Sequence, residues 1–162
     1  MITAVDAVEA LRSARATVAT AESLTGGLLC AALVGVAGAS DVVRGGIVAY
    51  APDSKTDLLG VGAELIAERG TVDADVAAAM ATGSRERFGA TYGLATTGVA
   101  GPDPSEGKPV GAVYIAIAGP GGVDTRLLHL SGNRETIRAE TVAALLSWLV
   151  ARLGEESRPD RG

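Results

Sequence analysis

The sequence predicts a single α/β domain, a three-layer α/β/α sandwich around a mixed, mostly parallel sheet of about five strands. Three observations support this fold class. Helical runs alternate with short apolar, β-branched runs along the 162 residues, as in layered α/β proteins. Two late strand-like runs flank the glycine-rich turn 119–122, so at least one neighbouring pair is antiparallel. The composition is 48% hydrophobic but 3% aromatic, so small and aliphatic side chains must form the core.

The first half of the chain is expected to alternate helices with two strands. Val5, Val8 and Leu11 recur at helical spacing and predict a helix over residues 6–15. A β-branched run predicts a strand at 15–21, and glycines end the following helix near residue 36. A second strand is expected at 42–50. Pro52 ends it and opens a short helix to Leu59, with Asp53 or Ser54 as its cap. A further helical turn is expected at 64–68.

The second half begins with a predicted helix at 73–88 and a buried strand at 91–97. The loop 98–111 holds three prolines and four glycines, and it is too long for an idle connection. A hairpin is expected from strands 110–118 and 123–130, followed by a helix over 135–153. The apolar face of that helix comprises Val142, Leu145, Leu146, Leu149 and Leu153. We therefore expect one domain over residues 1–153 and a flexible polar tail over 154–162.

Charge, cysteine content and motifs exclude several classes of function. The formal charge is −5 and no basic patch stands out, so nucleic acid is not an expected partner. Cys30 is the only cysteine and is expected to be a small buried side chain. The start lacks a signal-peptide pattern and no apolar run is long enough to span a membrane, which predicts a cytoplasmic protein without a membrane partner. No metal-ligand cluster or dinucleotide fingerprint is present, so neither metal nor cofactor is expected.

The most informative stretch is residues 20–27, where a strand, a sharp turn and a helix follow each other with Ser23 at the junction. A hydroxyl at the carboxyl end of a strand can face an open crevice. Unpaired backbone N–H groups around residues 24–27 can face a developing negative oxygen. Gly26 and Gly27 allow a substrate to approach the backbone. The alternative is that Ser23 or Thr25 merely caps the helix.

Two further stretches carry candidate site residues. Tyr50 closes a predicted strand, and Lys55 falls in the first turn of the next helix, where the helix dipole favours a neutral amine over a cation. The alternative is a solvated lysine and a tyrosine at a sheet edge. Thr97, Gly98 and Gly101 form another strand-to-glycine turn. They would line the same crevice if their strand lies beside the Ser23 strand; otherwise they form only a tight turn.

These motifs together resemble the CinA carboxy-terminal domain family, which includes nicotinamide-nucleotide amidases. The similar segments are residues 21–27, 45–50 with Lys55, 58–61 and 97–102, and the resemblance extends over about residues 4 to 153. Leu24 stands where the family usually has a cysteine, a side chain that is not the proposed nucleophile. Because the chain lacks the amino-terminal domain that many CinA proteins carry, the stand-alone amidase form is expected.

The resemblance implies a serine amidase that converts nicotinamide mononucleotide to nicotinate mononucleotide and ammonia, a step of pyridine nucleotide salvage and NAD metabolism. It implies Ser23, Lys55 and Tyr50 as the catalytic residues. The only histidine, His129, lies in a predicted strand far from the serine motif, so a Ser-His-Asp triad is not expected. Lys55, directly or relayed through Tyr50, is then the candidate base for Ser23.

The expected substrate-binding residues combine the two glycine turns with two arginines. Arg134 and Arg138, near the start of the last helix, are candidates for binding the substrate phosphate, since arginine suits phosphate geometry. The alternative is that they form an exposed helix face. The full set is Thr25, Gly26, Gly27, Thr97, Gly98, Gly101, Arg134 and Arg138.

Two other functions and the oligomeric state stay open. The same residues could act on another small amide, or the chain could be a non-catalytic nucleotide-binding module, which would not need Lys55. We expect a homodimer or higher homo-oligomer. Trp148 lies at the margin of the apolar face of the last helix. It could anchor a two-fold interface, as tryptophan often does, or it could lie over the edge of the core.

Overall fold

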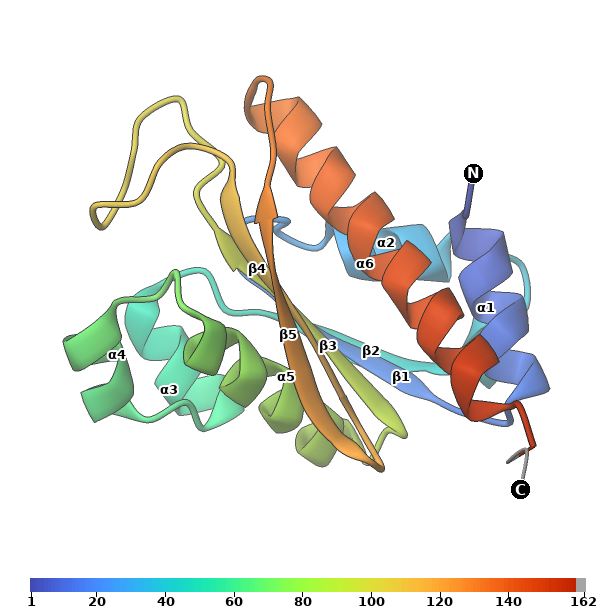
Figure 1. Cartoon of the computed structure of the whole chain (residues 1–162). Helices are drawn as coiled ribbons and strands as arrows, with labels where there is room; N and C mark the ends of the chain where they lie inside the picture. The colour runs from blue at the N-terminus through green and yellow to red at the C-terminus, as the bar shows by residue number, and fades with distance from the viewer. Residues whose placement is uncertain (160–162) are drawn as a thin grey trace.

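A five-stranded sheet runs through the molecule with helices on both faces (Figure 1). The computed structural model describes residues 1–159, so the last three residues of the predicted tail lie outside the described part. The described elements, in chain order, are α1 (Ala4–Ser13), β1 (Val18–Glu22), α2 (Leu28–Val34), the 3-10 turn η1 (Ala39–Asp41), β2 (Val43–Val48), α3 (Pro52–Leu59), α4 (Ala63–Arg69), α5 (Ala74–Phe88), β3 (Tyr92–Gly98), β4 (Ala112–Gly119), β5 (Gly122–His129) and α6 (Arg134–Glu156).

The sheet has the strand order β2-β1-β3-β4-β5. Strand β1 pairs in parallel with β2 and with β3, whereas β4 is antiparallel to both β3 and β5. Every strand except β4 therefore runs in the same direction, which confirms the predicted mixed, mostly parallel sheet.

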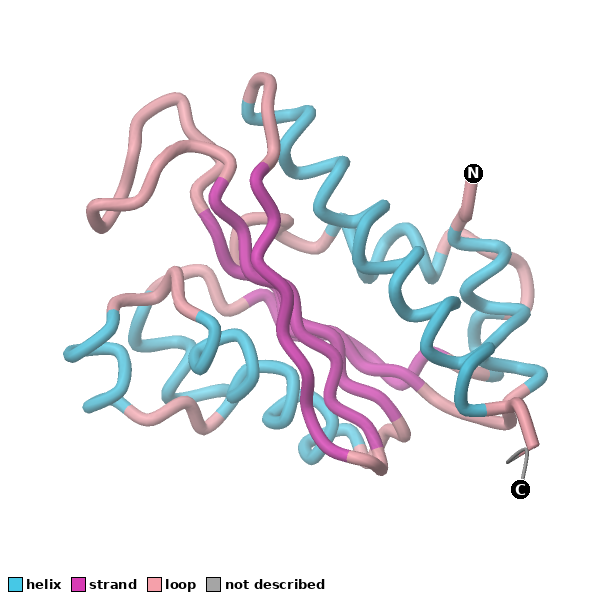
Figure 2. The backbone as a smooth tube through the Cα atoms, viewed as in Figure 1, coloured by secondary structure: helices cyan, strands magenta, loops and turns pink. Residues whose placement is uncertain are grey.

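The two faces of the sheet are covered by different helices. Helices α1, α2 and α6 pack on one face, and α3, α4 and α5 form the other layer, so the strands cross the molecule between two groups of helices (Figure 2). The predicted apolar stripe of the last helix is confirmed, because all five of its residues are buried. None of the helices in residues 1–159 is both long and apolar enough to cross a membrane.

Close backbone packing characterises the layer around α5. A Cβ atom on Gly93 of β3 would lie 2.0 Å from the carbonyl oxygen of Ala81, and one on Gly83 would lie 2.0 Å from that of Leu59. Only glycine fits these positions without a backbone shift. The glycines therefore bring α5 close to the sheet and α3 close to α5.

Several predicted boundaries shift for local reasons. Helix α1 starts at Ala4 because Thr3 and Asp6 form a capping box, in which each side chain accepts a backbone N–H of the other. The predicted cap of α3 was wrong: its N-cap is Ala51, with no side-chain cap and with proline in the first turn. Helix α6 continues to Glu156, three residues into the predicted tail. Cys30 is half-buried rather than buried.

Candidate active site

The carboxyl ends of β1, β2 and β3 meet at one edge of the sheet. Glu22, the last residue of β1, pairs with Val48 of β2 and with Thr96 of β3. The Thr97 strand therefore lies beside the Ser23 strand, which is the condition under which the two turns can line one crevice. The connection from β1 to β2 passes over one face through α2, and the connection from β2 to β3 passes over the other through α5. Such a reversal beside β1 is where α/β sheets commonly bind ligands.

Ser23 and Lys55 are joined by a hydrogen bond at this edge. The Lys55 Nζ donates to Ser23 Oγ over 3.0 Å and to the carbonyl oxygens of Ala49, at 2.6 Å, and Tyr50, at 3.4 Å. Lys55 is only 1% exposed, so the alternative of a solvated surface lysine is wrong. The first turn of α3, which begins at Pro52, directs this side chain back toward the end of β2.

The surroundings of Lys55 favour its neutral form. Burial lowers the pKa of Lys55 from its ordinary value of 10.5 to about 8, although the carboxylate of Glu106 opposes this shift. A neutral amine keeps two donors and gains a lone pair. Two N–H bonds to the Ala49 and Tyr50 carbonyls would then leave the lone pair available to the Ser23 hydroxyl. The arrangement is that of a nucleophile with an adjacent general base.

A buried carboxylate holds the turn that follows Ser23. Glu22 is 1% exposed. It accepts backbone N–H groups at the start of α2, at 3.2 Å from Gly27, 2.8 Å from Leu29 and 3.0 Å from Cys30. Sequence reasoning missed this role. The available signal was that Gly27, the N-cap of α2, has no side chain with which to cap, so another residue had to supply an acceptor.

The free donors of the serine turn differ from those expected. The Gly26 N–H donates to the Ser23 carbonyl at 3.1 Å, and Glu22 takes the Gly27 N–H. Among residues 1–159, no acceptor is recorded for the N–H groups of Leu24 and Thr25. These two groups, next to the Ser23 hydroxyl, are the better candidates for holding a negative oxygen. The alternative that Ser23 or Thr25 caps α2 is wrong, since its cap makes no side-chain bond.

The two threonines of the predicted binding set face the protein interior. Thr25 is fully buried and its hydroxyl lies 2.8 Å from that of Thr96. Thr97 is 1% exposed and donates to the carbonyl oxygen of Thr71 at 2.7 Å. These hydroxyls therefore position the two turns relative to their neighbours.

The two predicted glycines of the β3 turn have distinct steric roles. A Cβ on Gly98 would lie 2.7 Å from the side chain of Val113 on β4, so this residue allows close packing. Gly101 has a φ of 84°, in the left-handed region that favours glycine. Its carbonyl oxygen accepts from Arg134, which links the turn to α6.

Tyr50 and Arg134 form a pair at the rim of the site. Tyr50 is 61% exposed, and its hydroxyl accepts from an Arg134 nitrogen at 3.2 Å. Another Arg134 nitrogen donates to the Gly101 carbonyl at 2.7 Å. Within the described residues, the Tyr50 hydroxyl makes no recorded hydrogen bond to Ser23 or Lys55. The structure thus brings Ser23 and Lys55 together and places the Tyr50 side chain with Arg134.

Arg138 contacts the serine turn itself. Its guanidinium donates to the carbonyl oxygens of Leu24, at 2.8 Å, and Thr25, at 3.2 Å. These bonds hold the Leu24–Thr25 and Thr25–Gly26 peptide planes, the first of which carries the Thr25 N–H. Because Arg134 is exposed and Arg138 is engaged at the turn, Arg134 is the more accessible of the two phosphate candidates.

The remaining predicted residues lie away from this edge. His129 is exposed on β5, which β3 and β4 separate from β1. Trp148 is 7% exposed, and the Arg126 guanidinium lies 4.3 Å from its ring centroid. Of the two alternatives, the structure therefore supports Trp148 as a residue at the edge of the core. The predicted homo-oligomer stays a prediction.

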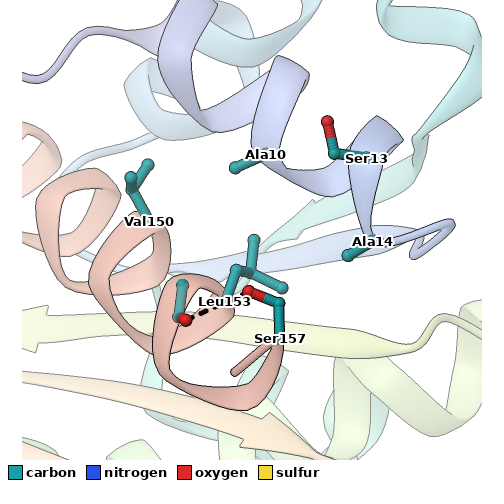
Figure 3. Close-up of a pocket in the computed structure, with 7 residues that line it drawn as sticks. Ala10, Ser13, Ala14, Val150, Leu153 and Ser157 are labelled. Carbon is teal, nitrogen blue, oxygen red and sulfur yellow. Dashed lines mark hydrogen bonds between the residues drawn. The ribbon is translucent and has the colours of Figure 1, made fainter. Parts of the chain in front are cut away.

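A cavity between α1 and α6 also lies outside the candidate site. It is lined by Ala10, Ser13, Ala14, Val150, Leu153, Gly154 and Ser157. The hydroxyl of Ser157 is already bonded to the Gly154 carbonyl, the dashed contact in Figure 3. Among residues 1–159, no lysine, histidine or carboxylate lines this cavity, and these residues offer no base for a serine nucleophile there.

Comparison with known proteins agrees with this architecture. The model of the family described as "CinA C-terminal domain" matches residues 2–153. A CinA-like protein from Frankia casuarinae is 55% identical over 138 residues, which cover 85% of this chain and 32% of that protein. A CinA-like protein from Mycolicibacterium gilvum is 49% identical, over 89% of this chain and 34% of that protein. The chain thus spans about a third of the length of these curated relatives.

A solved structure of similar length has the same fold. A CinA superfamily protein from Klebsiella pneumoniae superposes with a TM-score of 0.92 at 31% identity, covering 94% of this chain and 96% of that one. The fold and the match over residues 2–153 agree. This chain belongs to the CinA C-terminal domain family.

Proposed function

We propose that this protein is a serine amidase that hydrolyses nicotinamide mononucleotide to nicotinate mononucleotide and ammonia. The observation that carries the proposal is the 3.0 Å contact between Lys55 Nζ and Ser23 Oγ, made by a lysine that is 1% exposed. A buried lysine has no evident role in a module that only binds nucleotides. The choice of substrate rests on the resemblance of the motifs to nicotinamide-nucleotide amidases.

The first half of the proposed reaction forms an acyl-enzyme. Neutral Lys55 takes the proton of the Ser23 hydroxyl while Ser23 Oγ attacks the carboxamide carbon. The carbonyl oxygen becomes negative, and the N–H groups of Leu24 and Thr25 face it. The protonated Lys55 then gives its proton to the departing nitrogen, the C–N bond breaks, and ammonia leaves.

The second half of the reaction reverses these roles with water. Lys55, neutral again, takes a proton from a water molecule that attacks the Ser23 ester. The C–O bond to Ser23 breaks, Ser23 Oγ regains its proton from Lys55, and nicotinate mononucleotide is released. The net reaction consumes one water and needs no redox partner or metal.

The exposed Arg134 is the proposed contact for the substrate phosphate. Its guanidinium has five N–H donors, of which two are used by Gly101 and Tyr50. The Tyr50 hydroxyl orients this guanidinium. We therefore propose that the main role of Tyr50 is to position Arg134, and that relaying a proton between Ser23 and Lys55 is a lesser role. Arg138 instead positions the Leu24 and Thr25 peptides.

Measuring ammonia release from nicotinamide mononucleotide by the purified protein tests the proposal. Parallel reactions with the nucleoside that lacks the phosphate, and with a small amide such as asparagine, separate substrate classes. Faster release from the mononucleotide than from either is expected. Release only from the other amides would favour the alternative amidase. Binding of the mononucleotide without ammonia would favour a non-catalytic module.

A further inference from the structure

The loop between β3 and β4 is fixed at two points around the candidate site. It leaves the end of the sheet and extends beyond it toward the α3–α4 side of the molecule (Figure 1). Near its start, the Gly101 carbonyl accepts from Arg134, which also donates to Tyr50. Near its tip, Glu106 contacts the connection between α4 and α5. The first point belongs to the site described above, but the second has no role in the mechanism so far.

Several hydrogen bonds hold the Glu106 carboxylate, although a charged residue in a loop is usually solvated. Its oxygens accept the Thr71 N–H at 3.0 and 2.9 Å, the Thr71 hydroxyl at 2.7 Å and the Val72 N–H at 3.0 Å. A two-way backbone bridge between Ser105 and Lys108 forms the tight turn that presents Glu106. Glu106 has a φ of 53°, which is uncommon for a residue other than glycine.

The connection between α4 and α5 leaves space for this carboxylate at Gly70. A Cβ on Gly70 would lie 2.5 Å from Glu106 Oε2. The Thr71 carbonyl accepts the hydroxyl of Thr97, at the end of β3. A chain of hydrogen bonds therefore runs from Glu106 through Thr71 to the strand next to Ser23.

We propose that Glu106 is a positioning residue of the amidase, which latches the loop 99–111 to Thr71 and so fixes one wall of the Ser23–Lys55 centre. This inference rests on the proposed function for its catalytic meaning. Glu106 also acts on the base at a distance, since its negative charge raises the pKa of Lys55 against the effect of burial. The groups that Lys55 contacts directly, Ser23 Oγ and two backbone carbonyls, are neutral.

The variants Glu106→Gln and Glu106→Ala test the latch, and Asp103→Asn is the matched control. Asp103 is an exposed carboxylate on the same loop, and no hydrogen bond to it is recorded among residues 1–159. Glu106→Ala should lower kcat/KM by roughly tenfold or more, the size expected when one charge-assisted contact is lost. Glu106→Gln keeps one acceptor oxygen but loses the charge, so the rising limb of its pH–rate profile should move to lower pH. Asp103→Asn should leave both kcat/KM and the pH–rate profile unchanged.

Hydrogen exchange at the Thr71 and Val72 amides gives a readout that does not depend on activity. Both amides should exchange faster in Glu106→Ala than in the unmodified protein or in Asp103→Asn. Unchanged exchange would overturn the latch. Faster exchange with unchanged kcat/KM and pH profile would overturn the positioning role. Absence of ammonia from the unmodified protein would instead count against the proposed function, and the exchange rates would still decide the latch.

Discussion

The two helical layers bury apolar side chains against the same sheet but contain different kinds of residue. The layer of α1, α2 and α6 is packed with large aliphatic side chains and Trp148, and the charged side chain buried beside it, Glu22, caps the start of α2. The layer of α3, α4 and α5 is dominated by alanines and close backbone contacts, and it is the layer in which Lys55 is buried. A lysine amine can lose its water there because neighbouring backbones approach closely and supply carbonyl acceptors. The comparison indicates that the second layer shapes the base, whereas the first forms the larger apolar core and reaches the site only from the starts of α2 and α6, where Arg134 and Arg138 lie.

The largest expected effect is on catalysis without loss of folding. Ser23→Ala should lower kcat by several powers of ten, because the attacking group is lost. The melting temperature should change little, since the Ser23 side chain is only half-buried. The measurements are ammonia release and thermal unfolding of the same preparation. Near-normal release by the folded variant would rule out Ser23 as the nucleophile.

The next largest effect is expected on stability, for a substitution in the layer of α1, α2 and α6. Leu149→Ala removes a fully buried side chain of α6 and should lower the free energy of unfolding by about 2–5 kcal/mol. The kcat/KM of the folded protein should stay close to normal, because Leu149 lies in the second half of α6, whereas the site residues Arg134 and Arg138 lie at the start of that helix. Denaturant titration and steady-state kinetics measure the two quantities. A loss of activity as large as that of a site variant would show that the layers are not separable.

A substitution in the alanine-rich layer should affect stability and activity together. In Gly83→Ala the new Cβ would lie 2.0 Å from the Leu59 carbonyl at the end of α3. Relief of this clash should cost roughly 1–3 kcal/mol and should shift α3, which carries Lys55. Gly154→Ala, at an exposed glycine of α6 where a Cβ would meet nothing within 4 Å, controls for the gain in helix propensity. The free energy of unfolding and kcat/KM should both fall for Gly83→Ala. An unchanged kcat/KM would show that the packing of α3 against α5 does not affect the site.

The smallest expected effect concerns substrate binding at the rim. Arg134→Ala should raise KM for the mononucleotide by roughly tenfold, because one charge-assisted contact to phosphate is lost. KM for the nucleoside without phosphate should change much less. Arg138→Ala should instead lower kcat, because it releases the Leu24 and Thr25 peptides. Equal effects of Arg134→Ala on both substrates would assign this arginine to a structural role.

The sequence could predict the site where the signal is local. The β-branched run before Ser23, the glycines after it and Pro52 before Lys55 are neighbours in the chain, so their turns follow from known residue preferences. The adjacency of β1 and β3 stayed open, because a glycine turn at the end of each strand does not fix the strand order of the sheet. Such patterns placed Ser23 and Lys55 at one edge of the sheet.

Apart from the local cap that Glu22 provides for α2, the contacts that were missed join residues far apart in the chain. Arg138 reaches the Leu24 carbonyl across 114 positions, and Glu106 reaches Thr71 across 35. No residue preference marks such pairs, since a charged loop or helix residue is usually solvated. The resemblance implies a catalytic role for Tyr50 beside Lys55, yet the Tyr50 hydroxyl bonds to Arg134, 84 positions away.

The pH dependence of kcat/KM for nicotinamide mononucleotide tests the central claim, that neutral Lys55 is the base for Ser23. Because burial lowers the pKa of Lys55 to about 8, activity should rise with pH through about that value as the amine loses its proton. Lys55→Arg stays protonated throughout and should be inactive at every pH. A rising limb near pH 8 in the unmodified protein and none in Lys55→Arg is the predicted result. An active Lys55→Arg protein with the same limb would contradict the account.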